Sequence, residues 1–207
     1  IHEQHHKQLQ NSRTVQSPMS LNEILRKHYS KKRERKIGRY SATDIYKIRR
    51  GELTPENFFE GLPIDDEGIK NIFRGMAYED YLKKILDDEG IKQERREGDQ
   101  QLKYEYKIDE NITLVMMPDF SFKDVIWETK APGVVKEEIP TWYLDQLECQ
   151  HRITGKKIEF VQFTQPKDGL PPTVTLEFKP SDIRWKNIIN ILKEFDKKLR
   201  EKNEAHN

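Results

Sequence analysis

The sequence is poor in cysteine and in long apolar runs. Cys149 is the only cysteine among 207 residues, which excludes an internal disulfide and any zinc or iron–sulfur site built from several cysteines. No apolar run approaches the roughly 20 residues that a membrane-spanning helix needs, and no signal-peptide pattern opens the chain. We therefore expect a soluble, cytoplasmic protein that has no membrane partner.

The sequence also lacks an excess of either charge. Its 37 Lys and Arg residues are balanced by 36 Asp and Glu residues, for a net charge of +1. If the protein binds nucleic acid, its positive charge must therefore be local. Charged residues make up 35% of the chain and hydrophobic residues 34%, so we expect a thin core. The 10% aromatic content is enough to close that core and argues against general disorder.

The first half of the chain reads as helical. Residues 1–18 lack apolar periodicity and are expected to be a disordered tail, and 19–207 a single domain. The domain divides into a helical portion over 19–90, a sheet core over 91–180 and a C-terminal helix over 181–202. Predicted helices begin near Ser20, at Ser41 as an N-cap, at Thr54-Pro55 and near Asp65. The basic stretch 31–36 is either a solvated face or a phosphate-contacting patch.

The second half changes to the period of strands. Strands are expected over 102–108, 112–117, 124–130, 157–164 and 173–178, with a helix over 140–154. The short link 120–123 predicts that the strands 112–117 and 124–130 pair as a hairpin. The fold class is therefore α/β, with a central mixed sheet of about five strands flanked by helices and a helical N-terminal part.

Three polar residues follow or end these apolar strands. Asp119 comes directly after one strand, and Glu128 and Lys130 share one face of the next because side chains alternate. Two carboxylates at such close range repel each other, and a hard divalent cation such as Mg²⁺ resolves that repulsion. Lys130 can then orient the attacking water, so the trio suits metal-assisted hydrolysis of a phosphodiester. The alternative is a solvated cross-strand pair, which is common in a highly charged chain.

These residues resemble the signature of the PD-(D/E)xK nuclease superfamily. The segment from Gly75 to Glu79 resembles the G-x-x-x-(E/H) element of the RecB-like and lambda-exonuclease (YqaJ-type) branch. The resemblance implies a restriction-endonuclease-like core and an Mg²⁺ or Mn²⁺ cofactor without an iron–sulfur cluster. It also implies a set of site residues: Glu79, Asp119, Glu128 and the backbone carbonyl of Thr129 as metal ligands, and Asp119, Glu128, Lys130 and Gln146 as catalytic residues.

The same resemblance extends to the helix after the catalytic strand. Tyr143 and Gln146 are expected near DNA, and Arg39 and Ser41 are further candidates for DNA contact. The chain departs from the family pattern at Gln150, where the family often has Tyr, and at Glu79, where it often has His. Each assignment has a structural alternative: Glu79 can pair with Lys83 on its helix, Tyr143 can pack in the core, and Gln146 can be an ordinary polar position.

The sequence therefore predicts an Mg²⁺- or Mn²⁺-dependent deoxyribonuclease acting on single- or double-stranded DNA. By resemblance it is an exonuclease, with single-strand endonuclease activity left open, in recombination, repair or viral genome processing, and the family includes homo-oligomers. The alternatives are a restriction-type or structure-specific endonuclease and, from another class, a non-catalytic nucleic-acid-binding module on the same fold. A viral protein of this kind would act in the host cell.

Overall fold

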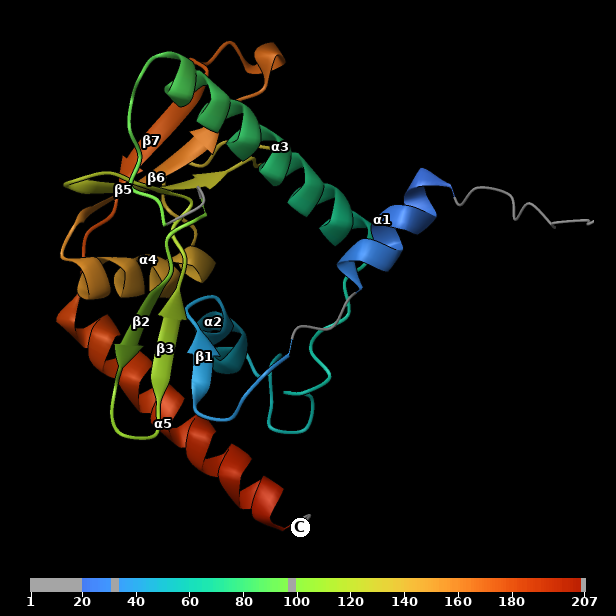
Figure 1. Ribbon diagram of the computed structural model, residues 1–207, viewed down its shortest axis with the longest axis vertical. Helices are drawn as coiled ribbons and strands as arrows, with labels where there is room; N and C mark the ends of the chain where they lie inside the picture. Colours follow the sequence, from blue (N-terminus) through green and yellow to red (C-terminus); the bar gives the residue numbers. More distant parts are fainter. Residues whose placement is uncertain (1–19, 31–33, 97–99, 206–207) are drawn as a thin grey trace, which may run out of the picture.

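The computed structural model describes residues 20–30, 34–96 and 100–205 (Figure 1). The elements of this part of the chain are, in order, α1 (Leu21–Tyr29), β1 (Arg39–Ser41), α2 (Asp44–Arg49), α3 (Asp66–Asp88), β2 (Tyr104–Lys107), β3 (Thr113–Met116), β4 (Phe120–Ser121), β5 (Val125–Lys130), α4 (Thr141–Thr154), β6 (Lys157–Phe163), the 3-10 turn η2 (Pro166–Asp168), β7 (Thr173–Glu177) and α5 (Asp182–Glu204).

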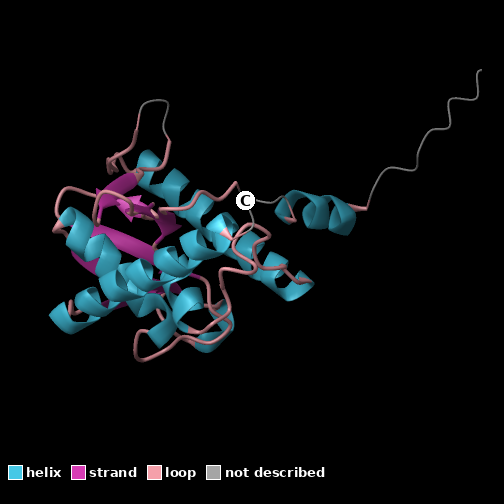
Figure 2. Ribbon diagram, turned by 90° about the horizontal axis from the view of Figure 1, so that it is seen from below, coloured by secondary structure: helices cyan, strands magenta, loops and turns pink. Residues whose placement is uncertain are grey.

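The described strands form two sheets. In the first, with order β1-β3-β2, β1 runs parallel and β2 antiparallel to β3. In the second, with order β4-β5-β6-β7, β5 and β6 are parallel and the two outer pairs are antiparallel. Seen from below, helices pack along the strands, while α1 lies away from the sheets and contacts α3 (Figure 2). The predicted mixed α/β class is confirmed, although the strands are divided between two sheets.

The predicted hairpin between the strands 112–117 and 124–130 is wrong. Both edges of β3 are already occupied, one by β1 and the other by β2. The antiparallel partner of β5 is β4, a two-residue strand inside the segment that was read as a link, and Phe120 pairs with Trp127. Apolar alternation shows where a strand lies but not which edge it joins, because tertiary contacts choose the partner.

Helix ends agree closely with the signals in the sequence. Ser20 and Glu23 form a capping box at the start of α1, and the Ser181 side chain caps α5. Gly155 ends α4 in the left-handed conformation, with φ of 69°. None of the helices in the described ranges is long and apolar enough to cross a membrane.

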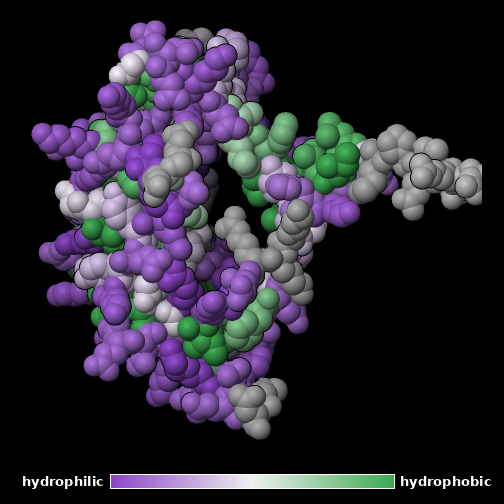
Figure 3. Space-filling model, in the orientation of Figure 1, coloured by the Kyte–Doolittle hydropathy of each residue, from purple (hydrophilic) through white to green (hydrophobic). Residues whose placement is uncertain are grey.

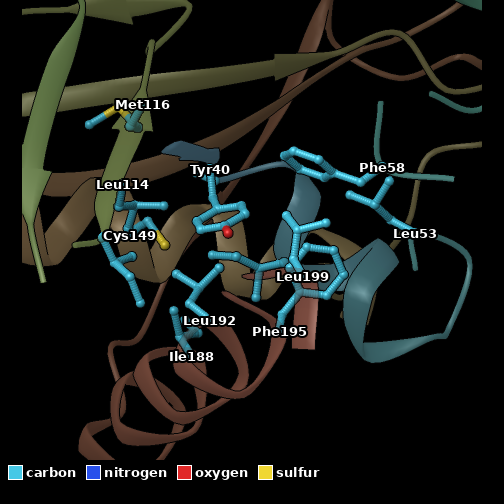
Figure 4. Close-up of a cluster of buried hydrophobic side chains, with 13 residues drawn as sticks. Tyr40, Leu53, Phe58, Leu114, Met116, Cys149, Ile188, Leu192, Phe195 and Leu199 are labelled. Atoms are coloured by element: carbon cyan, nitrogen blue, oxygen red, sulfur yellow. The ribbon is translucent and has the colours of Figure 1, made fainter. Parts of the chain in front are cut away.

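Helix α4 lies between the two hydrophobic clusters of the protein. On one side Cys149 joins the larger cluster, in which Tyr40, Phe195 and residues of β3 and α5 meet (Figure 4). On the other side Leu147 packs with Ile126 of β5 and the neighbouring β6. The Tyr40 hydroxyl donates a 2.5 Å hydrogen bond to Asp196, so this buried hydroxyl has a partner. Core packing on both sides fixes α4 rigidly beside β5.

Two predicted helix starts are wrong. Ser41 does not cap a helix, because it ends β1, and α2 begins at Asp44 after Thr43. No helix starts at Thr54-Pro55, where the chain forms successive turns. There Asn57 accepts a hydrogen bond from the Thr54 N–H and donates one to a backbone carbonyl. An Asn side chain that bonds the local backbone competes with a helix.

The apolar side chains along α3 are largely exposed. Phe73 is 54% exposed and Met76 47% exposed, whereas Ile69 and Leu86 are buried. Figure 3 shows hydrophobic side chains gathered over α1 and the adjoining part of α3. The body of the protein therefore covers only part of the length of α3.

The basic stretch is described only in part. The predicted tail 1–18 and residues 31–33, which include Lys31, Lys32 and Arg33, lie outside the described ranges. Arg35 forms two 3.1 Å hydrogen bonds with the buried Asp44 and lies 5.2 Å from the centre of the Phe58 ring. Arg35 therefore ties the segment before β1 to α2 and to the Phe58 ring.

We predict that Gly38→Ala destabilises the protein strongly. Gly38 has φ of +79°, and an added Cβ would collide with the carbonyl oxygen of Asn111. Gly51 has a similar φ of +70° with open space around it. Gly51→Ala should therefore cost about 1 kcal/mol from the backbone alone, and Gly38→Ala about 3 kcal/mol. Urea unfolding measures both, and equal losses would contradict the steric explanation.

Candidate active site

The acidic pair is brought together by the β4–β5 hairpin. Extending the pairing of Phe120 with Trp127 by one residue places Asp119 opposite Glu128. The Lys130 ammonium lies 2.5 Å from Glu128 Oε1 and 3.9 Å from Asp119 Oδ2. The two carboxylates thus share the Lys130 ammonium at the end of β5. The structure brings the three predicted residues together, although β4 and not β3 supplies the neighbouring strand.

Glu128 is the most deeply buried acid of this group, with 1% exposure. Its Oε1 accepts hydrogen bonds from Lys130 Nζ at 2.5 Å and from Gln146 Nε2 at 2.7 Å. Its Oε2 accepts one from Gln150 Nε2 at 2.6 Å. Charge-assisted bonds of this kind are short and strong, so the carboxylate is held from both ends.

Asp119 is held by the backbone of the neighbouring strand. Its Oδ2 accepts hydrogen bonds from the Thr129 N–H at 2.8 Å and from the Thr129 hydroxyl at 3.0 Å. Burial, and to a smaller extent repulsion from Glu128, raises the pKa of Asp119 from 3.8 to about 8, and the charge of Lys130 only partly opposes this rise. The carboxyl group is thus held where its negative charge is unfavourable without a further cation.

Lys130 supplies the positive charge of the site. Burial on its own lowers the pKa of the Lys130 ammonium, but the charges of Glu128 and Asp119 outweigh burial and raise it above its usual range. The ammonium also lies 5.2 Å from the centre of the Tyr143 ring, a distance at which the ring face attracts a cation. Lys130 therefore stays charged at neutral pH.

Glu79 reaches the site from α3, which packs against β5. Burial, together with repulsion from Glu128, raises the pKa of Glu79, while the charge of Lys130 and the nearby Thr129 side chain lower it. The preceding residue, Tyr78, stacks on Phe163 of β6 with ring centres 4.7 Å apart and planes within 17°. This stack anchors the helix at the position that brings Glu79 beside β5.

The residues present fit a hard divalent cation. Glu79, Asp119 and Glu128 contribute three carboxyl groups against the single ammonium of Lys130, so the group as a whole lacks positive charge. Within the described ranges no three acidic, histidine or cysteine side chains form a ready-made metal cage. Mg²⁺ does not need one, because it is commonly held by one or two carboxylates with water and phosphate oxygens completing its shell.

Of the residues predicted to contact DNA, Tyr143 lies at the site, whereas Arg39 and Ser41 lie elsewhere. Tyr143 packs against Phe160 at 5.2 Å between ring centres, and it faces Lys130, so it has both the core role and a place at the site. Arg39 and Ser41 lie on β1, in the other sheet. The Arg39 guanidinium is paired with Glu105, and the Ser41 hydroxyl is bonded to Thr43. Their predicted DNA contacts stay predictions.

Sequence reasoning missed two contributors. Gln150 was noted only as a departure from a family pattern, yet it donates directly to Glu128. Its position four residues after Gln146 was a usable signal, because i and i+4 share one face of a helix. Tyr78 gave no such signal, because its partner Phe163 is distant in the sequence.

We predict that Asp119→Asn stabilises the metal-free protein at neutral and mildly alkaline pH. Since the folded-state pKa of about 8 lies above the ordinary 3.8, the stability contributed by the protonated carboxyl is present below about pH 4. It is lost as the pH rises toward 8. Asn keeps the acceptor for Thr129 without the charge, so the free energy of unfolding at pH 8 should rise by about 1–2 kcal/mol.

Urea unfolding in a chelator at pH 4 and pH 8 measures this effect. The exposed Asp124, in the turn between β4 and β5, provides the control Asp124→Asn, which should change stability little at either pH. An Asp119→Asn protein no more stable than the wild type at pH 8 would contradict the electrostatic account.

Comparison with known proteins identifies the fold. No protein-family model matches the chain, and no curated protein matches its sequence. Among solved structures, the alkaline exonuclease LHK-Exo from Laribacter hongkongensis matches with 15% identity and a TM-score of 0.53, over 82% of this chain and 91% of that one. A phage-related exonuclease from Haemophilus somnus 129PT matches with 13% identity and a TM-score of 0.52, over 91% and 100%.

A third structure, that of SSO0001, matches with 16% identity and a TM-score of 0.57, over 84% of this chain and 81% of that one. LHK-Exo has also been solved in complex with dAMP. At these identities the likeness concerns the fold alone. The chain therefore has the fold of the alkaline and phage-related exonucleases, which is the nuclease fold that its resemblance to the PD-(D/E)xK superfamily predicted.

Proposed function

We propose that this chain is a divalent-metal-dependent deoxyribonuclease that hydrolyses phosphodiester bonds. One observation carries the proposal: the buried acid Glu128 and the partly buried acid Asp119 share the ammonium of Lys130 at a strand end, with the acid Glu79 beside them. A purely structural ion pair would need one acid for one lysine. An excess of carboxyl groups withdrawn wholly or partly from water is costly for stability and suits a site that receives a cation.

The residues of the chain have separate roles in this proposal. Glu79, Asp119, Glu128 and the Thr129 carbonyl would hold Mg²⁺ or Mn²⁺, which when bound polarises a phosphoryl oxygen and acidifies water. The Lys130 ammonium, fixed by Glu128 and by the Tyr143 ring, orients the attacking water and stabilises negative charge on the phosphate. Gln146 holds the Glu128 carboxylate in place through its 2.7 Å hydrogen bond.

An exonuclease is the mode that the comparisons favour. Two of the structures that share this fold are described as exonucleases, and one of them binds dAMP. We propose DNA as the partner and recombination, repair or viral genome processing as the setting, with single-strand endonuclease activity as a further capability. The proposed DNA contacts are Tyr143 and Gln146 at the site, with Arg39 and Ser41 on β1 as further candidates.

We predict that Asp119→Asn and Lys130→Ala each lower nucleotide release by at least about 100-fold. The first change removes a charged ligand, and the second removes the cation that positions the nucleophile. Acid-soluble nucleotide release from linear DNA, with Mg²⁺, with Mn²⁺ and with chelator, measures the effect. Asp124→Asn and Lys123→Ala, in the exposed turn at the other end of the same hairpin, should keep wild-type activity.

Full activity in either site variant would overturn the assignment of the active site. A wild-type protein that binds DNA but releases nothing with either metal would be a non-catalytic binding module. Asp119→Asn is informative in each case, since its fold is expected to be at least as stable as that of the wild type.

We also predict that activity requires a DNA end. End-labelled linear DNA should be degraded progressively, while a covalently closed circle of the same sequence stays intact. Gel analysis over time distinguishes the modes, and a nicked circle serves as an intermediate control. Linearisation of the closed circle at a rate comparable to loss of the linear substrate would instead support a restriction-type or structure-specific endonuclease.

A further inference from the structure

Gln150 is buried at the centre of the molecule and directed at the proposed metal ligand Glu128. It has no exposed surface, and its side-chain nitrogen donates a 2.6 Å hydrogen bond to Glu128 Oε2. The other oxygen, Oε1, is bound by Gln146 and Lys130. Gln150 is thus the donor that fixes the second oxygen of this carboxylate.

The two glutamines act from one rigid support. Gln146 and Gln150 are four residues apart on α4, so their side chains lie on the same face one turn apart. That helix is held between the two hydrophobic clusters. A carboxylate bonded through both oxygens to one helix cannot rotate about its terminal torsion, which is otherwise broad. Its lone pairs are therefore aimed in a fixed direction.

The remaining oxygen of Gln150 shows what this arrangement costs. Gln150 Oε1 is buried and has no hydrogen-bond partner among the described residues, whereas buried polar atoms normally have one. Exchanging the amide nitrogen and oxygen would place a carbonyl oxygen against the Glu128 carboxylate, which is repulsive. The amide therefore gives up a partner at one end in order to donate to Glu128 at the other.

A second buried glutamine shows how a structural amide behaves. Gln162, with 1% exposure, accepts a 2.9 Å hydrogen bond from the Lys136 N–H and donates one of 2.9 Å to the Lys136 carbonyl. Both polar atoms of the Gln162 side chain are therefore paired with backbone groups, which gain a hydrogen-bond partner in return. Among the described residues, the Gln150 side chain bonds no backbone group and donates only to a charged side chain, which indicates a role toward the site.

We propose that Gln150 is a positioning residue that orients Glu128 to bind a divalent cation. The inference rests on the proposed function, and it gives the position a different role from direct contact with DNA. Hydrogen-bond partners of metal-binding carboxylates set ligand direction, and their loss commonly weakens metal affinity or activity by about 10- to 100-fold.

The test is Mn²⁺ affinity measured by titration calorimetry without DNA, with thermal unfolding of the metal-free proteins in parallel. Gln150→Met keeps the length of the side chain but removes the donor. Gln150→Asn keeps an amide but withdraws it from Glu128. We expect both to bind Mn²⁺ about 10- to 100-fold more weakly than the wild type.

Cys149→Ala is the matched control, because Cys149 is fully buried on the same helix but faces the larger hydrophobic cluster. It should lower the melting temperature and leave Mn²⁺ affinity unchanged. Wild-type affinity in a folded Gln150→Met protein overturns the inference, and so does an equal loss of affinity in Cys149→Ala. If Gln150→Met does not fold, Gln150→Asn decides. Failure of the proposed function looks different, since the wild type itself would then bind no Mn²⁺ and release no nucleotide.

Discussion

The balance between the acids around Glu128 and one lysine governs the candidate site of this protein. Glu128 is almost fully buried, and the Lys130 ammonium 2.5 Å away is the cation that makes its negative charge tolerable there. Asp119 lies 3.9 Å from the same ammonium, yet burial and the repulsion from Glu128 still raise its pKa to about 8. A buried pair of this kind contributes little net stability. The arrangement is better explained by what it can bind than by what it stabilises.

Elements of the fold hold each acid of the site in place. The two-residue β4 is long enough to place Asp119 opposite Glu128 and short enough to leave the Thr129 N–H free to bond the Asp119 carboxylate. The stack of Tyr78 on Phe163 fixes α3, and the two hydrophobic clusters fix α4. Each acid is thus held by a different element, and none can move far without disturbing the core.

The sequence predicted the helices and strands better than their partners. Gly155 and the Ser181 cap gave the ends of α4 and α5, because such signals act within a few residues. The pairing of β3 with β1 could not be read in the same way, since it joins residues more than seventy positions apart, such as Arg39 and Thr113. Propensity and alternation are the same whichever neighbour a strand joins.

The same difference between local signals and long-range contacts applies to the residues of the site. Asp119, Glu128 and Lys130 were predictable because one short hairpin brings them together, whatever lies beyond it. Gln150 was hard to assign because its importance depends on which face of α4 meets β5, and Leu147 and Cys149 on that helix are both buried. When a helix is buried on two sides, its apolar pattern does not say which polar residue faces an acid. The hydrogen bond to Glu128 and the unpartnered oxygen of Gln150 together reveal the direction of its amide. In helices enclosed in this way, an unsatisfied buried polar atom carries information about the site that periodicity cannot supply.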